Sequence, residues 1–126
     1  MLLLAVSATH LKAKKGRVNE QIRQIQALQL RQRAEHMAAD EVMNEGWNNT
    51  SILILGDFNS EITDASVRSI LSQEESNSTA DPWKFKLAYP LDGGYLQGVT
   101  DLYTTWKSRK DGAVCHIVDY IFHSSR

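Results

Sequence analysis

Two polar residues end the most apolar stretch of this sequence, and their types suit a metal or phosphate site. Asp57 and Asn59 follow the apolar residues 52–55 and a glycine at position 56. A carboxylate and an amide two residues apart can give oxygen atoms to one metal ion or one bound phosphate. The alternative is that the two side chains only form a turn, which is the commoner role of both residue types. These residues alone favour the turn and leave the metal or phosphate site open.

A basic group follows the first apolar run of the chain. His10 lies at the end of that run, and Lys12 and Lys14 come just after it, followed by Lys15 and Arg17. Cationic side chains at a strand exit can form the rim of a phosphate site, in which His10 and Lys12 point into a cleft. They can equally form a solvated turn, and for Lys15 and Arg17 the turn is favoured.

A third polar residue, Asp119, interrupts an apolar run near the carboxyl terminus, where it stands between Val118 and Tyr120. A carboxylate inside such a strand is costly to bury without a partner. Asp119 is therefore expected either to face solvent or to orient another polar group.

The elements that position these residues are strands followed by a long helix. Residues 3–10 and 52–55 have the aliphatic composition of strands, and the second run suits a strand buried on both faces. Gly56 then lets the backbone turn, which would place Asp57 and Asn59 at the carboxyl end of a strand, where α/β sheets bind ligands.

A helix is expected between these strands, from an N-cap at Asn19 to about Gly46. Four apolar residues at helical spacing define the face expected to pack on the sheet: Val18, Ile22, Ile25 and Leu28. A second, short helix is expected from a cap at Thr63 or Asp64 to about Ser72.

The residue pattern in the last third of the sequence predicts a β-hairpin. Residues 73–81 are polar and read as a loop, and residues 83–99 read as irregular with one helical turn near Leu87. Residues 103–106 and 114–123 are β-branched and aromatic, with a charged turn over residues 107–112. This pattern indicates two antiparallel strands.

Composition limits the class of protein. The sequence has 126 residues, is 42% hydrophobic and carries a formal charge of −1, which fits one globular domain or part of one. Bulk charge does not indicate nucleic-acid binding, although a local basic patch is compatible with this total. The single cysteine, Cys115, excludes an internal disulfide framework, and we expect an intracellular protein, cytoplasmic or mitochondrial. No apolar run reaches the roughly 20 residues of a membrane span.

Four motifs taken in order resemble the endonuclease/exonuclease/phosphatase superfamily. They are Thr-His-Leu-Lys-Ala-Lys at residues 9–14, Gly-Asp-Phe-Asn-Ser at 56–60, Tyr-Thr-Thr-Trp-Lys at 103–107 and Asp-Tyr-Ile-Phe at 119–122. The combination resembles the nocturnin and angel branch, whose relatives are the poly(A) deadenylases. This resemblance implies a two-sheet α/β sandwich with helices outside, of which residues 1–126 are the carboxyl-terminal portion of one domain.

The resemblance also implies catalytic roles in a Mg²⁺-dependent phosphate-ester hydrolase. Asp57 would orient or deprotonate the attacking water, Asn59 would hold a metal-bound water or a phosphate oxygen, and both would lie at the metal. His10 would donate to the phosphate, and Asp119 would orient a catalytic histidine. That histidine and the principal metal-binding glutamate are expected outside this sequence, so we expect the chain by itself to be inactive. His116 and His123 are not expected to substitute for that histidine.

Two substrates are compatible with the resemblance. One is NADP(H), which would lose its 2′-phosphate, and the other is the 3′ end of poly(A) RNA, which a 3′–5′ exoribonuclease would shorten. Lys12, Lys14 and Arg109 are the basic residues expected around the distal phosphate. Lys14 stands where the branch carries arginine. A lysine there keeps the positive charge but lacks the planar guanidinium that can form two parallel hydrogen bonds. A non-catalytic binding fragment is the alternative from a different class.

Overall fold

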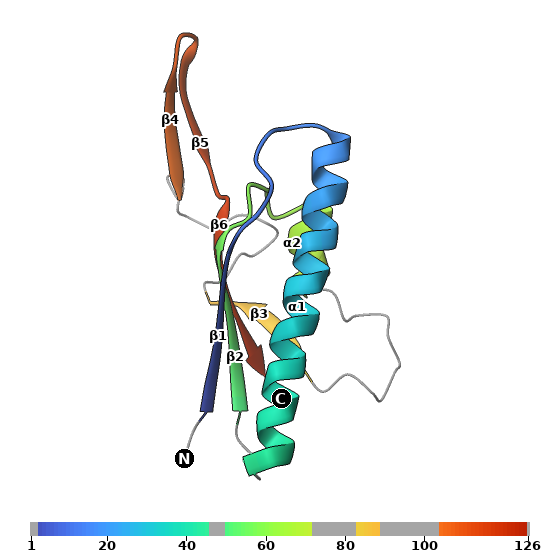
Figure 1. Ribbon diagram of the computed structural model, residues 1–126. Coiled ribbons are helices and arrows are strands. Elements are labelled where there is room, and N and C mark those ends of the chain that lie inside the picture. Colours follow the sequence, from blue (N-terminus) through green and yellow to red (C-terminus); the bar gives the residue numbers. More distant parts are fainter. Residues whose placement is uncertain (1–2, 46–49, 72–82, 89–103, 126) are drawn as a thin grey trace.

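The computed structural model describes residues 3–45, 50–71, 83–88 and 104–125 and shows a mixed α/β arrangement (Figure 1). The predicted fold class, with strands and external helices, is therefore confirmed. The elements in chain order are β1 (Leu3–His10), α1 (Arg17–Glu45), β2 (Thr50–Asp57), α2 (Ala65–Leu71), β3 (Lys84–Leu87), β4 (Thr105–Arg109), β5 (Gly112–His116) and β6 (Asp119–Ser125). No helix in these ranges combines the length and the apolar character that a membrane span requires.

Four strands form the main sheet in the order β1-β2-β6-β3. β1 and β2 are parallel, with α1 as their connection, whereas β6 runs antiparallel to both β2 and β3. α1 runs along one face of this sheet, and the β4–β5 hairpin extends past the end of the sheet at which β1 finishes (Figure 1). The ends of β1 and β2, the start of β6 and the base of the hairpin therefore meet in one region.

The core lies between the sheet and the helices. Phe58 is fully buried and makes edge contacts with Tyr120 and Phe122, at ring-centroid distances of 5.7 and 5.2 Å. The hydroxyl of Tyr120 lies 2.9 Å from the carbonyl oxygens of both Ser60 and Ile117. This packing fixes the turn that follows β2 against β6, because edge-to-face aromatic pairs and satisfied buried hydroxyls both restrict motion.

The predicted buried face of the long helix is wrong. Val18, Ile22, Ile25 and Leu28 are exposed, and Val18 is 68% accessible. α1 instead turns to the core a face of small residues and arginines, namely Arg23, Ala27, Arg31, Ala34 and Ala38. The alanines allow α1 to approach the sheet and α2 closely. The two arginines pair with Glu20 and Glu35 of the same helix.

Arg31 shows how an arginine can occupy that interface. Its guanidinium pairs with Glu35 at 2.8 Å and donates to the carbonyl oxygens of Ser69 and Ile70, each at 3.3 Å. The carbon of the guanidinium lies 5.3 Å from the ring centre of Phe85. A pattern that counts only apolar side chains misses such a face, because a buried arginine needs backbone acceptors that the sequence does not display.

The predicted start of the long helix also needs correction. α1 begins at Arg17, and Asn19 does not cap it: its amide nitrogen donates to the carbonyl of Lys15 at 3.0 Å. α2 starts where it was predicted: it begins at Ala65, and the carbonyl oxygen of Asp64 accepts from the N–H of Arg68 at 3.0 Å. The side-chain acceptor for its first turn comes from α1, because the N–H of Ser66 donates to Glu20 at 2.9 Å. The carboxylate of Asp64 accepts from the N–H of Glu61 instead.

β2 differs from the prediction in length and burial. It runs to Asp57 without turning at Gly56, and its residues alternate between buried and half-buried, so only the helix-facing side is fully covered. Gly56 has φ of +143°, and a Cβ there would lie 1.9 Å from the carbonyl oxygen of Thr9. The glycine is therefore needed for close approach of β1 and β2, and no turn depends on it.

The third part of the chain contains one strand that the prediction missed. Residues 84–87 form β3, so the expected helical turn near Leu87 is wrong. Phe85 is buried while Lys84 and Lys86 are exposed, a period-two alternation typical of a strand. The predicted loop at residues 73–81, and residues 89–99, lie outside the described ranges.

The predicted hairpin exists with different bounds. Its strands are β4 and β5, joined by a turn at Lys110 and Asp111, while the predicted strand over residues 114–123 is two strands. The break falls at Ile117 and Val118, after which β6 leaves the hairpin and joins the main sheet. Asp119 is thus the first residue of a new strand.

Candidate functional site

Three ionisable residues of the predicted site lie in one row across three strands. In the sheet register His10 is paired with Asp57, and Asp57 is paired with Asp119. Directly paired residues project to the same face, here the face opposite the helices. Nε2 of His10 lies 3.5 Å from Oδ2 of Asp57. The side chain of Asp57 is 34% accessible and that of His10 is 70% accessible, so both can reach a ligand.

The turn after β2 holds Asp57 and Asn59 in fixed positions. The N–H of Asn59 donates to Oδ1 of Asp57 at 2.8 Å, and Asn59 has φ of +49°. Its side-chain nitrogen donates to the carbonyl of Leu11 at 3.0 Å, which joins the turn to the end of β1. Turn formation, the alternative from sequence, therefore does occur. It also leaves Oδ1 of Asn59 as the side-chain atom that can accept from, or ligate, a bound group.

Asp119 is held by two threonines at the start of β4. Oγ1 of Thr105 donates to Oδ2 of Asp119 at 3.1 Å. Oγ1 of Thr104 accepts from the N–H groups of Val118 and Asp119, at 3.0 and 3.1 Å. Asp119 was expected either to face solvent or to orient another polar group. In the structure its side chain is half-buried, and its carboxylate accepts a hydrogen bond from Thr105. The Thr-Thr pair thus supports the position of this carboxylate.

An open cleft of about 890 Å³ lies between the loop after β1 and the β4–β5 hairpin. Asn59 lines it, whereas His10, Asp57 and Asp119 do not. Lys14 and Arg109, both predicted to bind a distal phosphate, line it together although 95 positions separate them in sequence. Lys12 does not line it. The other lining residues that carry charge or side-chain hydrogen-bonding groups are Lys15, Arg17, Glu20, Arg23, Asn59, Glu61, Asp64, Lys107 and His116. The cleft is therefore rich in cations and is also lined by three carboxylates, those of Glu20, Glu61 and Asp64.

Sequence reasoning missed Lys107 and His116 as lining residues. Lys107 is two positions from Arg109, and the period-two alternation of a hairpin strand places both on one face, so this residue could have been found. His116 lies across the hairpin from Thr105, and its Nδ1 is 3.1 Å from Oε1 of Glu61. No local pattern in the sequence indicates that contact, since Glu61 belongs to the turn after β2.

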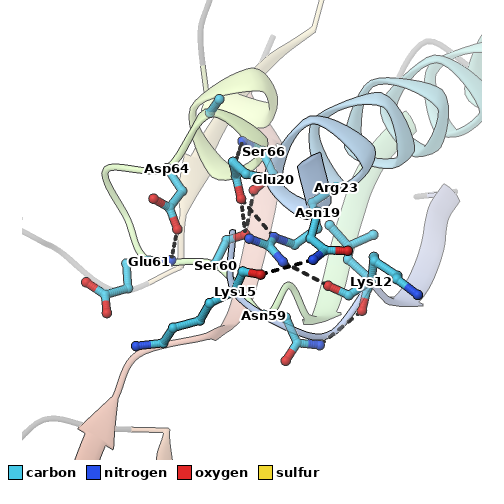
Figure 2. A network of polar contacts seen from close by, with 12 residues as sticks. Lys12, Lys15, Asn19, Glu20, Arg23, Asn59, Ser60, Glu61, Asp64 and Ser66 are labelled. Atoms are coloured by element: carbon cyan, nitrogen blue, oxygen red, sulfur yellow. Dashed lines mark hydrogen bonds and ion pairs between the residues drawn. The ribbon is translucent and has the colours of Figure 1, made fainter. Parts of the chain in front are cut away.

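A polar network under the cleft joins α1 to the turn after β2 (Figure 2). Glu20 is its centre: it pairs with Nε of Arg23 at 2.8 Å and accepts from Oγ of Ser60 at 3.1 Å and from the N–H of Ser66 at 2.9 Å. Burial acts to raise the pKa of Glu20, but the hydrogen bonds from Ser66 and Arg23 and the charge of Arg23 outweigh it, so the pKa is lowered. Glu20 is thus held as a carboxylate.

The residues that could hold Mg²⁺ are Asp57 and Asn59. They offer one carboxylate and one amide oxygen on a rigid turn, which is the kind of donor that Mg²⁺ takes from proteins, together with water and substrate phosphate. Within the described ranges no group of three His, Cys, Asp or Glu side chains could hold a metal ion. Asp57 and Asn59 therefore fit a Mg²⁺ site as part of its ligand set.

The geometry and the sequence agree with one class of enzyme. Residues 16–126 match the Endonuclease/Exonuclease/phosphatase family, and the chain belongs to this family, whose members are hydrolases of phosphate ester bonds. Within it the chain belongs to the nocturnin-like branch. It is 30% identical over 129 residues to Nocturnin of Drosophila melanogaster, a match that covers 94% of this chain and 19% of that protein.

A solved structure gives the same relationship. The chain is similar to the human Nocturnin catalytic domain, determined with a bound sulfate anion, with a TM-score of 0.55 and 26% identity. The similarity covers 95% of this chain and 35% of that one. The predicted family, its α/β sandwich fold and the partial coverage of the domain are therefore confirmed.

Proposed function

We propose that this chain carries the phosphate-binding cleft and part of the catalytic rim of a Mg²⁺-dependent hydrolase that removes the 2′-phosphate of NADP(H). The observation that carries the proposal is the meeting of Lys14 and Arg109 in one cleft beside Asn59. A dianionic phosphate is well matched by cations that converge from two directions. The human relative was solved with bound sulfate, a tetrahedral anion like phosphate.

The chemistry at the rim follows from the row of paired residues. Asp57, held by the N–H of Asn59, orients the attacking water and accepts its proton. His10, next to Asp57, donates a hydrogen bond to the phosphate oxygens as their charge grows in the transition state. Mg²⁺ bound at Asp57 and Asn59 would supply positive charge that polarises the phosphate.

Asp119 has a supporting role in this proposal. Its carboxylate is fixed by Thr105 and by backbone contacts to Thr104, in the same row as Asp57. A carboxylate held in this way can orient an imidazole and stabilise its charged form. We propose that it orients a catalytic histidine from outside the 126 residues.

Poly(A) RNA is the second candidate substrate. The β4–β5 hairpin, which carries Lys107 and Arg109, extends past the end of the sheet (Figure 1). Cations along such an extension could follow a longer polyanion than a dinucleotide, because phosphate contacts dominate nucleic-acid affinity. A 3′–5′ exoribonuclease would use the same water, metal and rim.

Binding to residues 1–126 tests the two substrates without requiring turnover. NADP⁺, NAD⁺ and oligo(A) are titrated against the wild type, Lys14→Ala and Arg109→Ala by calorimetry. Each substitution should weaken NADP⁺ binding about 5- to 30-fold, because one charged hydrogen bond in an open cleft contributes about 1–2 kcal/mol. NAD⁺ binding should change little, since NAD⁺ lacks the 2′-phosphate.

Lys84→Ala is the matched control, because Lys84 is an exposed lysine of β3 that does not line the cleft. Equal affinity for NADP⁺ and NAD⁺, with tighter binding of oligo(A) that depends on Arg109, would favour the exoribonuclease. A protein extended in both directions that binds these ligands but hydrolyses none of them would support the non-catalytic alternative.

A further inference from the structure

The loop that carries Lys14 is held from behind by a buried arginine of α1. Arg23 is 5% accessible, and its Nη1 donates to the carbonyl oxygens of Lys12 at 3.0 Å and Lys14 at 2.8 Å. Gln26, one turn further along α1, accepts the N–H of Lys12 at 3.0 Å. The backbone of the loop is thus bound through both its donors and its acceptors.

Arg23 is also joined, through Glu20, to the turn after β2. Nε of Arg23 donates to Glu20, and Glu20 accepts from Oγ of Ser60, the residue after Asn59 (Figure 2). Oγ of Ser66 donates to Oγ of Ser60 at 2.7 Å, which completes the connection to α2. One guanidinium therefore links the loop after β1 to the turn after β2.

The conformation of Lys14 explains why the loop needs such support. Lys14 has φ of +79°, a region that residues with a side chain rarely adopt. A backbone in this region persists only where its surroundings determine it. The hydrogen bond from Arg23 to the carbonyl of Lys14 itself is a direct constraint of this kind.

We propose that Arg23, with Glu20 and Gln26, is a positioning residue that fixes the backbone of residues 12–14 so that the side chain of Lys14 enters the cleft. Arg23 borders the cleft but is only 5% accessible, and its Nε and Nη1 atoms donate to Glu20 and to the carbonyl oxygens of Lys12 and Lys14, so we infer that it acts through the loop. The identity of the anion that Lys14 binds rests on the proposed function, whereas the conformation of the loop does not. The two statements can therefore fail separately.

Limited proteolysis of residues 1–126 tests the loop. Arg23→Lys keeps the charge and the trypsin site but replaces the planar fork by a single ammonium, which cannot span two carbonyls and a carboxylate. Trypsin cleavage after Lys12, Lys14 and Lys15 should accelerate on the order of tenfold, because the loop opens locally more often. Arg33→Lys is the control, since Arg33 is an exposed residue of the same helix.

A milder variant covers the case in which Arg23→Lys does not fold. Gln26→Ala removes one hydrogen bond to the loop and should accelerate cleavage at the same three lysines, by a smaller factor. The inference is overturned if neither variant changes these rates, or if cleavage rises equally at Arg68 and Lys110, because a uniform rise reports global destabilisation.

A double-mutant cycle with NADP⁺ as the probe tests whether Arg23 acts through Lys14. Arg23→Lys should weaken binding about as much as Lys14→Ala, and should add less than a twofold loss when Lys14→Ala is already present. The same loss in both backgrounds would overturn the positioning role. If Lys14→Ala leaves NADP⁺ binding unchanged while Arg23→Lys still opens the loop, the proposed function fails and the loop support stands.

Discussion

Replacing Glu20 by glutamine should destabilise the protein at neutral pH and remove part of its dependence on pH. The carboxylate of Glu20 joins Arg23 of its own helix to Ser60 and Ser66. Glutamine keeps one acceptor oxygen but no charge, so the buried guanidinium of Arg23 loses its ionic partner.

The size of the expected loss in the free energy of unfolding depends on how deeply the Glu20–Arg23 pair is buried. Removing one member of a fully buried ion pair costs about 3–5 kcal/mol. Here the side chain of Arg23 is 6% accessible and that of Glu20 is 22% accessible, and Arg23 keeps two backbone acceptors. We therefore expect a smaller loss, of about 1–3 kcal/mol in the free energy of unfolding.

The pH dependence has a definite sign. The pKa of Glu20 is lowered in the folded protein, so the carboxylate contributes stability above its unfolded pKa and loses it as the pH falls through the folded one. The unfolded pKa of a glutamate is about 4.3. The difference between wild type and Glu20→Gln should thus be full at pH 7 and should shrink only as the pH falls below about 4.3.

Urea denaturation at pH 7, 5 and 3.5 measures this difference. Asp111→Asn, a change in the exposed turn of the hairpin, is the control and should show no comparable loss at any pH. A difference that stays constant from pH 7 to 3.5 would refute the reasoning, because it would show that the charge of Glu20 contributes nothing.

Three further changes test the site. Gly56→Ala should unfold the protein or lower its free energy of unfolding by at least about 3 kcal/mol in urea denaturation, since the new Cβ meets the carbonyl of Thr9 at 1.9 Å; a fully stable variant would contradict the close approach of β1 and β2. Thr105→Val, in a catalytically competent longer protein, should reduce kcat about 3- to 30-fold with little change in KM, because Asp119 loses an orienting donor; an unchanged kcat would exclude that role. Residues 1–126 alone should release no phosphate from NADP(H) with Mg²⁺, because Asp57 and Asn59 provide an incomplete ligand set; release that Asp57→Ala abolishes would contradict this expectation.

The sequence predicted that His10, Asp57 and Asp119 lie close together better than it predicted the buried face of α1. His10 and Asp57 each end an apolar strand, as expected, and strands of one sheet meet at a common edge. Asp119 was expected inside a strand and instead begins β6, where it is paired with Asp57. The buried face of α1 could not be found in this way. Arg23 is buried against carbonyl oxygens of the loop after β1, and Arg31 against carbonyl oxygens of α2, and neither set of acceptors is evident from the sequence of α1.

The cleft illustrates a second limit of local patterns. Lys14 and Arg109 come together because Asn59 is bound to Leu11 on one side, while Thr105 and His116 of the hairpin contact Asp119 and Glu61 on the other. Each of these contacts spans at least 14 residues of sequence, and the contact between Glu61 and His116 joins two side chains that lie outside the four motifs. The resemblance to a family supplied what the spacing could not.

The face of the sheet that carries His10, Asp57 and Asp119 also carries exposed apolar side chains. Leu4, Val6 and Ile121 are 48%, 55% and 45% accessible, and they project to the same side of the sheet as His10, Asp57 and Asp119. A protein layer on that face would remove water from the neighbourhood of the row and strengthen every charge interaction in it, because Coulomb energies rise as the local dielectric falls. The electrostatic strength of this site therefore depends on what covers the apolar face, and the Glu20 network, on the helix side of the sheet, can hold the loop and the turn in place without that cover.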